Sequence, residues 1–247
     1  MDYAEWAPYY RRIQSEFGFP FDREESSARL LERLLPVGAK ADPLPQLRPL
    51  FHGKSVIVAG LAPSLGAPPL WKLPSSVDLP VLVAADGATS RCLDGGLVPD
   101  VIVTDLDGPI PAELSANARG ARVVVHAHGD NEGAIREWLP QFTGILSGSW
   151  AGPPRAGLLN VGGFTDGDRA AFLAEHLGAR RIFLWAFDFE DPEESEPKAR
   201  QRKLAKLRWA RELLGLLASR RRSEVYSWDS TGAVSRYEPS VTGPSIQ

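Results

Sequence analysis

Three aspartates follow two apolar runs, at positions where carboxylates can hold a metal ion. Asp86 closes VLVAA (81–85), and Asp105 and Asp107 close VIVT (101–104). Side chains two positions apart in extended backbone point the same way, so we expect Asp105 and Asp107 on one side of the chain. Hard carboxylate oxygens suit Mg²⁺, which also binds substrate phosphate oxygens. The spacing predicts a magnesium–nucleotide site; the competing interpretation is that each Asp caps a turn, since Asp-Gly is common turn chemistry.

Further polar residues stand just after the other apolar runs. These residues are Gly60, Ser64, His126, His128, Asp130, Asn131 and Asp188. Ligands of open α/β sheets bind at the carboxyl ends of the strands, so we expect these side chains to share a site with the aspartates. The alternation of His126, His128 and Asp130 is compatible with a transition-metal site, but we interpret the histidines as hydrogen-bonding or substrate-positioning groups.

Two more segments have residues that suit phosphate chemistry. The stretch NVGGFTDGD, beginning at Asn160, resembles a glycine turn entering a helix, where free amides bind phosphate or a polar ring; it is equally a plain strand-to-helix connection. The helix predicted from Lys198 has leucines on one face, with Lys203 and Lys206 largely off it. A solvated basic face is the default interpretation. Phosphoryl transfer needs cations beside the metal, so both lysines are candidates for phosphate contact.

Alternating strands and helices position these residues. Apolar runs predict strands at 55–59, 81–85, 101–104, 122–126, 158–161, 181–187 and 224–228. Helix-compatible segments lie at 88–94, 111–118, 131–139, 164–177 and 198–219. This alternation predicts an α/β fold with an open, mostly parallel, Rossmann-like sheet and helices on both faces.

The chain before this sheet predicts two helices. An apolar face, ended by Gly18 and Pro20, is formed by Trp6, Tyr9, Tyr10, Ile13 and Phe17. We interpret these aromatic residues as packing against the main domain rather than as ligand contacts. A second helix is expected to be capped by Asp22 or Ser26 and to end at Pro36 and Gly38. Three prolines, at positions 43, 45 and 49, predict a turn-rich linker.

The predicted organisation has three parts. Residues 1–50 form a helical segment that packs on the core, residues 51–228 form the α/β domain, and residues 229–247 form an irregular tail. With 247 residues, of which 43% are hydrophobic, the chain can bury a full core.

Composition excludes several classes of function. A formal net charge of -3 argues against a dedicated nucleic-acid binder. The single cysteine, Cys92, leaves no internal disulfide and no multi-cysteine zinc site. The first residues lack a continuous apolar core, so we expect no signal peptide, and no run approaches the ~20 apolar residues that span a bilayer. We therefore expect a cytoplasmic protein without a membrane partner.

Several motifs together resemble a known family. They are GLAPSL, AADGATSRCLDGGLVPDVIVTDLDG, VHAHGDN, NVGGFTDGDRA and KLAKLRWARELL. The chain over roughly residues 55–215 is similar to the archaeal 6-hydroxymethyl-7,8-dihydropterin pyrophosphokinases (MptE-like enzymes), and the amino-terminal aromatic helices also fit. The central motif is more distantly similar to thiamine pyrophosphokinase, which has ADGG and then a strand ending in DFD. Ala88 in place of the second glycine, and Gly108 in place of a serine, favour the pterin branch.

The resemblance implies transfer of the β,γ-diphosphate of ATP to the hydroxymethyl group of a reduced pterin, with release of AMP. It implies that Mg²⁺ is held by Asp105 and Asp107, with Asp86 and Asp130 beside them; Asp130 is a candidate for a further metal contact or for orienting the acceptor hydroxyl. The expected nucleotide contacts are Gly60, Ser64, Asp86, Gly87, His128, Lys203 and Lys206. Asn160 and Asp166 are candidates for contact with the pterin edge. Because the thiamine enzymes are dimers, we also expect a homodimer.

Other classes of function remain open from the motifs alone. VIVTDLDGP resembles the first motif of haloacid dehalogenase phosphatases, with Asp105 as nucleophile and Asp107 as acid. Against this, that motif normally lies on the first core strand and ends in threonine, whereas two predicted strands precede it here and Pro109 holds that place. A glycosyltransferase with a similar core is a second alternative, disfavoured by the short chain. A thiamine-type diphosphokinase and a non-enzymatic nucleotide-binding module are the others.

Overall fold

A computed structural model describes residues 1–39, 43–62, 66–70, 79–190, 192 and 194–238; Ser64 lies outside the described residues. Its centre is a nine-stranded sheet with the order β6-β5-β4-β3-β2-β1-β7-β8-β9. The strands are β1 (Ser55–Ala59), β2 (Val81–Ala85), β3 (Val101–Thr104), β4 (Arg122–Ala127), β5 (Leu146–Trp150), β6 (Leu158–Leu159), β7 (Arg181–Trp185), β8 (Glu224–Trp228) and β9 (Val234–Arg236). All neighbouring pairs are parallel except β8 with β9. The predicted α/β fold is confirmed.

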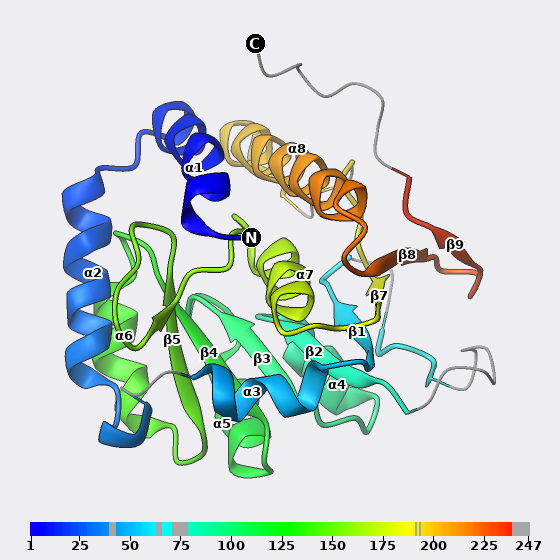
Figure 1. Cartoon of the computed structure of the whole chain (residues 1–247), viewed down its shortest axis with the longest axis horizontal. Helices are drawn as coiled ribbons and strands as arrows, with labels where there is room; N and C mark the ends of the chain where they lie inside the picture. The colour runs from blue at the N-terminus through cyan, green and yellow to red at the C-terminus, as the bar shows by residue number, and fades with distance from the viewer. Residues whose placement is uncertain (40–42, 63–65, 71–78, 191, 193, 239–247) are drawn as a thin grey trace.

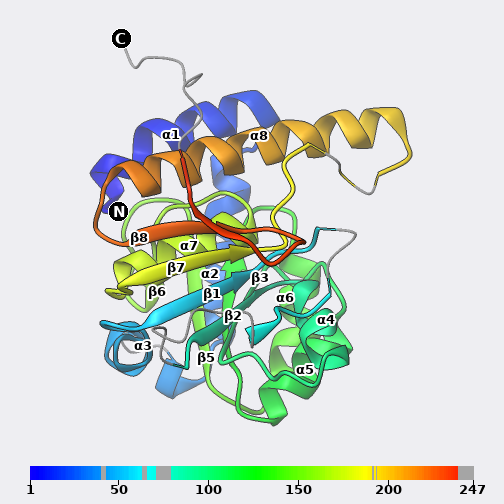
Figure 2. The same ribbon diagram turned by 90° about the vertical axis from the view of Figure 1, so that its right-hand side faces the viewer.

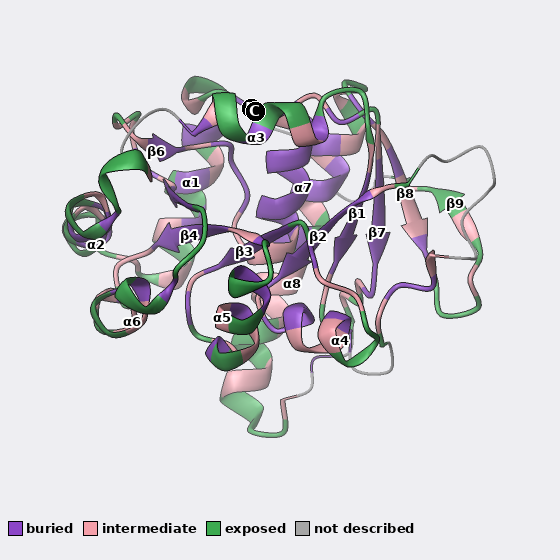
Figure 3. Ribbon diagram, turned by 90° about the horizontal axis from the view of Figure 1, so that it is seen from below, coloured by how far each residue is buried: buried purple, intermediate pink, exposed green. Residues whose placement is uncertain are grey.

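Helices cover both faces of the sheet (Figure 1). They are α1 (Tyr3–Phe17), α2 (Phe21–Leu34), α3 (Leu44–Phe51), α4 (Ala88–Asp94), α5 (Ile110–Ala118), α6 (Glu132–Trp138), α7 (Asp166–His176) and α8 (Pro197–Ser219), with short 3-10 turns at Val37–Ala39 and Leu139–Gln141. Seen from below, α3 and α7 lie on one side of the strands, and α4, α5 and α6 on the other (Figure 3).

Side chains alternate along each strand, so each central strand contributes to hydrophobic cores on both faces of the sheet. Val56 and Val58 of β1 pack with α1, α7 and α8 on one face. Ile57 and Ala59 pack on the opposite face with residues of β2 and α4. Burial on both faces explains why the central strands are continuous apolar runs in the sequence.

The structure differs from four local predictions. The LSGSW segment of β5, rich in serine and glycine, forms a strand that the apolar pattern did not indicate. The expected proline-rich linker contains α3, whose Pro45 stands in the first turn, where a proline costs no hydrogen bond. Helix α2 begins at Phe21 with Pro20 as its N-cap, so it is capped by neither Asp22 nor Ser26. Within the expected irregular tail, β9 pairs with β8.

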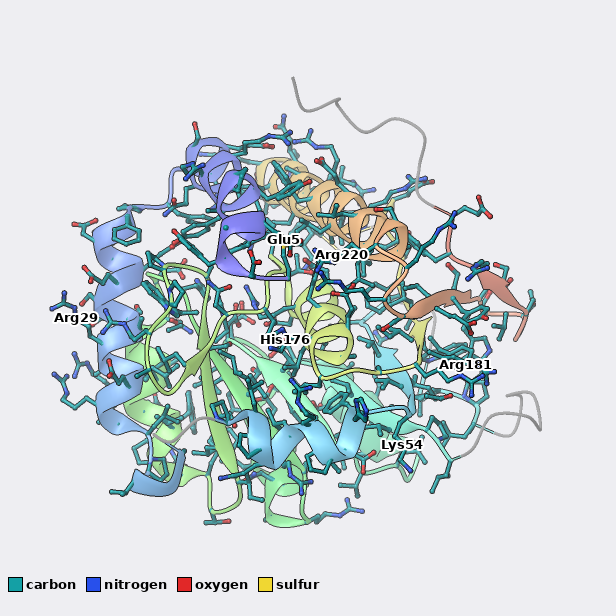
Figure 4. The ribbon with its side chains drawn as sticks, viewed as in Figure 1. Glu5, Arg29, Lys54, His176, Arg181 and Arg220 are labelled. Atoms are coloured by element: carbon teal, nitrogen blue, oxygen red, sulfur yellow. The ribbon has the colours of Figure 1, made fainter. Side chains whose placement is uncertain are left out.

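The two longest helices, α1 and α8, lie side by side above α7 (Figures 1 and 2). Arg220, just after α8, donates from Nη1 to Glu5 of α1 over 3.0 Å and from Nε to Glu175 of α7 over 3.1 Å (Figure 4). Nε1 of Trp209 also donates to Glu16 of α1 over 2.8 Å. These bonds fix the amino-terminal helix against the α/β domain. Among the described residues, no helix is both long and apolar enough to cross a membrane.

Candidate active site

The chain reverses its direction across the sheet between β1 and β7, which are neighbours although many residues separate them. Such a switch point opens a crevice at the carboxyl ends of the strands. Gly60, Ala186 and Phe187 follow these two strands and line a cavity of about 320 Å³. A Cβ atom on Gly60 would come within 2.7 Å of the carbonyl oxygen of Ala186, so this approach requires glycine. We call this space the switch-point cavity.

Three carboxylates converge beside this cavity. Asp86, Asp105 and Asp107 each offer an oxygen, and these oxygens lie within 4.8 Å of one another. We call these residues the acidic cluster. The predicted convergence is observed, but its expected cause was wrong. The backbone between Asp105 and Asp107 is not extended, because Leu106 has a left-handed φ of 68°. Asp86 is also left-handed, with a φ of 43°, and such conformations often mark functional sites.

The acidic cluster carries unevenly distributed charge. Burial and the neighbouring Asp105 raise the pKa of Asp86. Burial, Asp105 and Asp86 raise the pKa of Asp107 to about 7. Burial alone would also raise the pKa of Asp105, but His128 outweighs it and holds that pKa well below its usual range. The cluster therefore holds mutually repelling carboxylates that a cation would stabilise.

His128 bridges two aspartates. Its Nε2 lies 2.9 Å from Oδ2 of Asp105, and its Nδ1 lies 2.6 Å from Oδ1 of Asp130. Burial lowers the pKa of His128, but these two contacts dominate and raise it to about 9. The imidazole is therefore a cation at neutral pH. Asp130 lies on the far side of His128 from Asp105. It does not belong to the acidic cluster, whose carboxylate oxygens lie within 4.8 Å of one another.

A second cavity, of about 130 Å³, borders the acidic cluster at Asp105, whereas Asp86 lines the switch-point cavity. Aromatic rings from α1 and from the segments after α1 and β6 line it: Trp6, Tyr10, Phe19 and Phe164. Its polar lining includes Asp105, His128, Asp130 and Lys206. We call it the aromatic cavity. Lys206 of α8 lines both cavities, so the same side chain borders each of them.

The donor set of the acidic cluster fits Mg²⁺. All three groups present carboxylate oxygens, the ligand type that this ion prefers. Oδ1 of Asp105 is buried and has no hydrogen-bond partner among the described residues. A buried carboxylate oxygen without a partner is costly unless a ligand satisfies it.

The structure places the remaining predicted residues in different surroundings. Gly87, Lys203 and Asp166 line the switch-point cavity together with Gly60 and Asp86. Asp166, expected at the pterin edge, thus lies with the expected nucleotide contacts and accepts a 3.1 Å bond from Arg169. Asn160 lines neither cavity, and its amide donates to the carbonyls of Ala151 and Gly152.

Sequence reasoning missed several residues of the site. Trp6 and Tyr10 were interpreted as packing residues; they belong to the core and also form a wall of the aromatic cavity. Glu24 of α2 lines the same cavity. Glu113 of α5 is fully buried, and burial together with Asp86 raises its pKa to about 9. Nothing in the sequence marked Glu24 or Glu113 as site residues, because glutamates in helices usually face solvent.

An open α/β sheet with a carboxylate cluster between two cavities at its switch point defines a class of ligand-binding α/β proteins. The family model described as "6-hydroxymethylpterin diphosphokinase MptE-like" matches residues 32–194, and the chain belongs to this family. Three curated relatives are named 6-hydroxymethyl-7,8-dihydropterin pyrophosphokinase. The protein of Pyrococcus furiosus is 40% identical, covering 91% of this chain and 98% of the relative. The protein of Methanothermobacter thermautotrophicus is 41% identical, covering 76% of this chain and 79% of the relative. The protein of Methanocaldococcus jannaschii is 36% identical, covering 76% of this chain and 80% of the relative.

Proposed function

We propose that this protein transfers the β,γ-diphosphate of ATP to the hydroxymethyl group of 6-hydroxymethyl-7,8-dihydropterin and releases AMP. The observation that carries the proposal is the position of the acidic cluster between two cavities, with Lys206 lining both. A group-transfer enzyme has to hold donor and acceptor on opposite sides of the transferred group. The names of the relatives supply the acceptor.

The switch-point cavity suits the nucleotide. It is the larger space and lies where α/β folds bind nucleotides. Lys203 and Lys206 of α8 line it together with Thr165, the N-cap residue of α7, and Gly167 in the first turn of that helix. Lysines suit the phosphate chain, because their point charges balance the charge that develops on the leaving group.

Asp86, Asp105 and Asp107 would hold Mg²⁺ in this proposal. The ion, when bound, neutralises the phosphate chain and makes the β-phosphorus open to attack. The protein's own contribution is orientation. His128 fixes the carboxylate of Asp105 from one side, and Asp130 fixes His128 from the other.

The aromatic cavity suits the pterin. Its rings offer flat apolar surfaces to a bicyclic heterocycle, and Asp105, His128 and Asp130 face its polar end. Asp130 is the proposed acceptor for the proton of the pterin hydroxyl, which it would orient toward the phosphate chain. A loose transition state needs little help from a strong base, so positioning matters most.

The physiological setting is part of the same proposal. The product would enter a tetrahydromethanopterin- or folate-type pterin pathway in the cytoplasm. The proposal requires neither nucleic acid nor membrane, and it includes a homodimer as the expected assembly.

An assay with ATP, Mg²⁺ and the hydroxymethyl-dihydropterin tests the proposal. Pterin-dependent AMP with a pterin diphosphate is the expected result, and its absence across metals and pH would refute the proposed function. Thiamine in place of the pterin tests the thiamine-type alternative. Phosphate release from small phosphoesters would instead favour the phosphatase, and hydrolysis of a sugar nucleotide the glycosyltransferase. Asp105→Asn and Asp107→Asn should each abolish turnover in a folded protein.

A further inference from the structure

Glu24 is a buried carboxylate at the edge of the aromatic cavity. It stands in the first turn of α2, is only 7% exposed and lines that cavity with Trp6 and Tyr10. Its side chain packs against the loop after β4, since a Cβ on Gly129 would lie 3.3 Å from its Cγ. The carboxylate is therefore held in place rather than free in solvent.

The described residues leave this carboxylate largely unsatisfied. Its hydrogen bond within the described part of the chain comes from Nε2 of Gln14, at a long 3.4 Å. Two cations that line the same cavity have other partners: His128 pairs with Asp105 and Asp130, and Arg169 donates to Asp166 and to the carbonyl of Phe164.

A largely buried carboxylate with one long hydrogen bond costs stability, so a purely structural role is a poor explanation for Glu24. A first-turn acid stabilises a helix equally well from an exposed position. Asp22 of the same turn is exposed and shows this alternative. The neighbouring Glu25 accepts from Arg29 over 2.9 Å and from Arg155 over 3.3 Å outside the cavity. Glu24 differs from Glu25 in lining an aromatic cavity, where Oε2 accepts only the long bond from Gln14 in the described part of the chain.

We propose that Glu24 binds the acceptor heterocycle by taking two adjacent N–H donors, a ring N–H and an exocyclic amino group, on its two oxygens. A carboxylate matches such a paired edge because it only accepts hydrogen bonds, and two bonds fix orientation as well as position. This assignment rests on the proposed function and goes beyond it by naming the group that selects the ring.

The assignment also orients the acceptor. On a 6-hydroxymethyl pterin, the N–H edge and the hydroxymethyl group stand at opposite ends of the bicyclic ring. With the edge held at Glu24, the far end of the ring, with its hydroxymethyl group, faces other lining residues of the cavity, which include Asp105 of the acidic cluster. Glu24 is thus a binding and specificity residue and takes no part in the chemical step.

Glu24→Gln tests this role, with Glu25→Gln as the matched control on the same helix. Each full-length protein is titrated with the stable oxidised 6-hydroxymethylpterin, followed by pterin fluorescence, and with a non-hydrolysable ATP analogue. The assay described above is run in parallel on the same samples. Glu24→Gln is expected to weaken pterin binding roughly 10- to 100-fold, the range for a lost hydrogen bond to a charged group, while binding of the ATP analogue stays unchanged.

A second readout separates recognition from packing. The wild type should bind the 2-amino pterin more tightly than an analogue without the amino group, and Glu24→Gln should lose that discrimination. If the wild type turns over the pterin while Glu24→Gln binds and discriminates like Glu25→Gln, the role of Glu24 is refuted and the proposed function stands. Equal weakening of pterin and ATP analogue also refutes it, since this indicates a disturbed fold. A wild type that neither binds nor converts the pterin overturns both.

Discussion

Gly108 lies directly against Asp86: a Cβ atom at position 108 would come within 3.0 Å of both carboxylate oxygens of Asp86. The glycine after the acidic pair therefore makes room for the third carboxylate of the cluster. Gly108→Ala should displace the Asp86 carboxylate and lower turnover by about 10²-fold, the cost of roughly 1 Å of misplacement in an active site.

Gly133→Ala is the control for this substitution. Position 133 lies in α6, and an added Cβ there meets no atom within 4 Å. Steady-state kinetics at several Mg²⁺ concentrations should leave Gly133→Ala at wild-type activity. Equal activity of the two variants would contradict the link between Gly108 and the acidic cluster.

Asp107→Asn should stabilise the metal-free protein at high pH. The pKa of Asp107 is raised to about 7, so its ionisation costs folding free energy as pH rises toward and through that value. The side chain is exposed, and solvent screening reduces this cost to about 1 kcal/mol, or about 2–4 °C in melting temperature. Thermal denaturation with a chelator at pH 8 should show the gain. The gain should shrink as pH falls and disappear below about pH 4, where the aspartate is protonated in the unfolded chain as well. A gain of equal size at both ends of this pH range would contradict the charge repulsion.

Lys203 and Lys206 should differ in their kinetic effects. Lys203 lines the switch-point cavity alone, whereas Lys206 lines both cavities. Lys203→Met should raise KM for ATP by about tenfold and leave KM for the pterin unchanged, as expected for a lost charge-assisted contact. Lys206→Met should lower kcat by about 10²–10³-fold, because it removes a cation next to the transferred group. Indistinguishable kinetic profiles for the two variants would refute this division.

Pterin binding should weaken as pH falls below about 7. Burial raises the pKa of Glu24 to about 7, against the opposing effects of His128 and Arg169 and with Asp130 adding to the rise. Below that pH the group is a neutral acid and loses one of its two acceptor positions. Affinity should fall by about tenfold per pH unit, since one unit corresponds to about 1.4 kcal/mol. Fluorescence titrations between pH 5.5 and 7.5 check this, and Glu24→Gln should show a flat profile.

Most of the sheet and the acidic cluster were predictable from sequence, because buried parallel strands are apolar runs and their polar neighbours fall at one edge. The strand β5 was not. A Cβ on Gly148 would lie 2.4 Å from the side chain of Leu158 and 2.8 Å from that of Leu35, so glycine in the middle of this strand gives these leucines room to pack. Local propensity treats a glycine flanked by serines as a turn, whereas here the packing of α2 determines the structure.

The other half of the site depends on contacts between residues distant in sequence. Nothing in the sequence places Trp6 or Glu24 beside Asp105, since that proximity results from α1 and α2 packing against strand ends formed much later in the chain. The pairing of His128 with Asp105 is of the same kind. The left-handed Leu106 was also unpredictable, because a leucine rarely adopts that conformation.

Part of the wall of the aromatic cavity comes from a stretch of chain that the family model does not match. The model matches residues 32–194, which include the acidic cluster and Phe164, whereas Trp6, Tyr10 and Glu24 precede it. In the proposed function, the residues that select the ring and those that hold the phosphate chain therefore come largely from different stretches of sequence. Substitutions in α1 and α2 that spare the buried core would then change the accepted heterocycle without altering the acidic cluster.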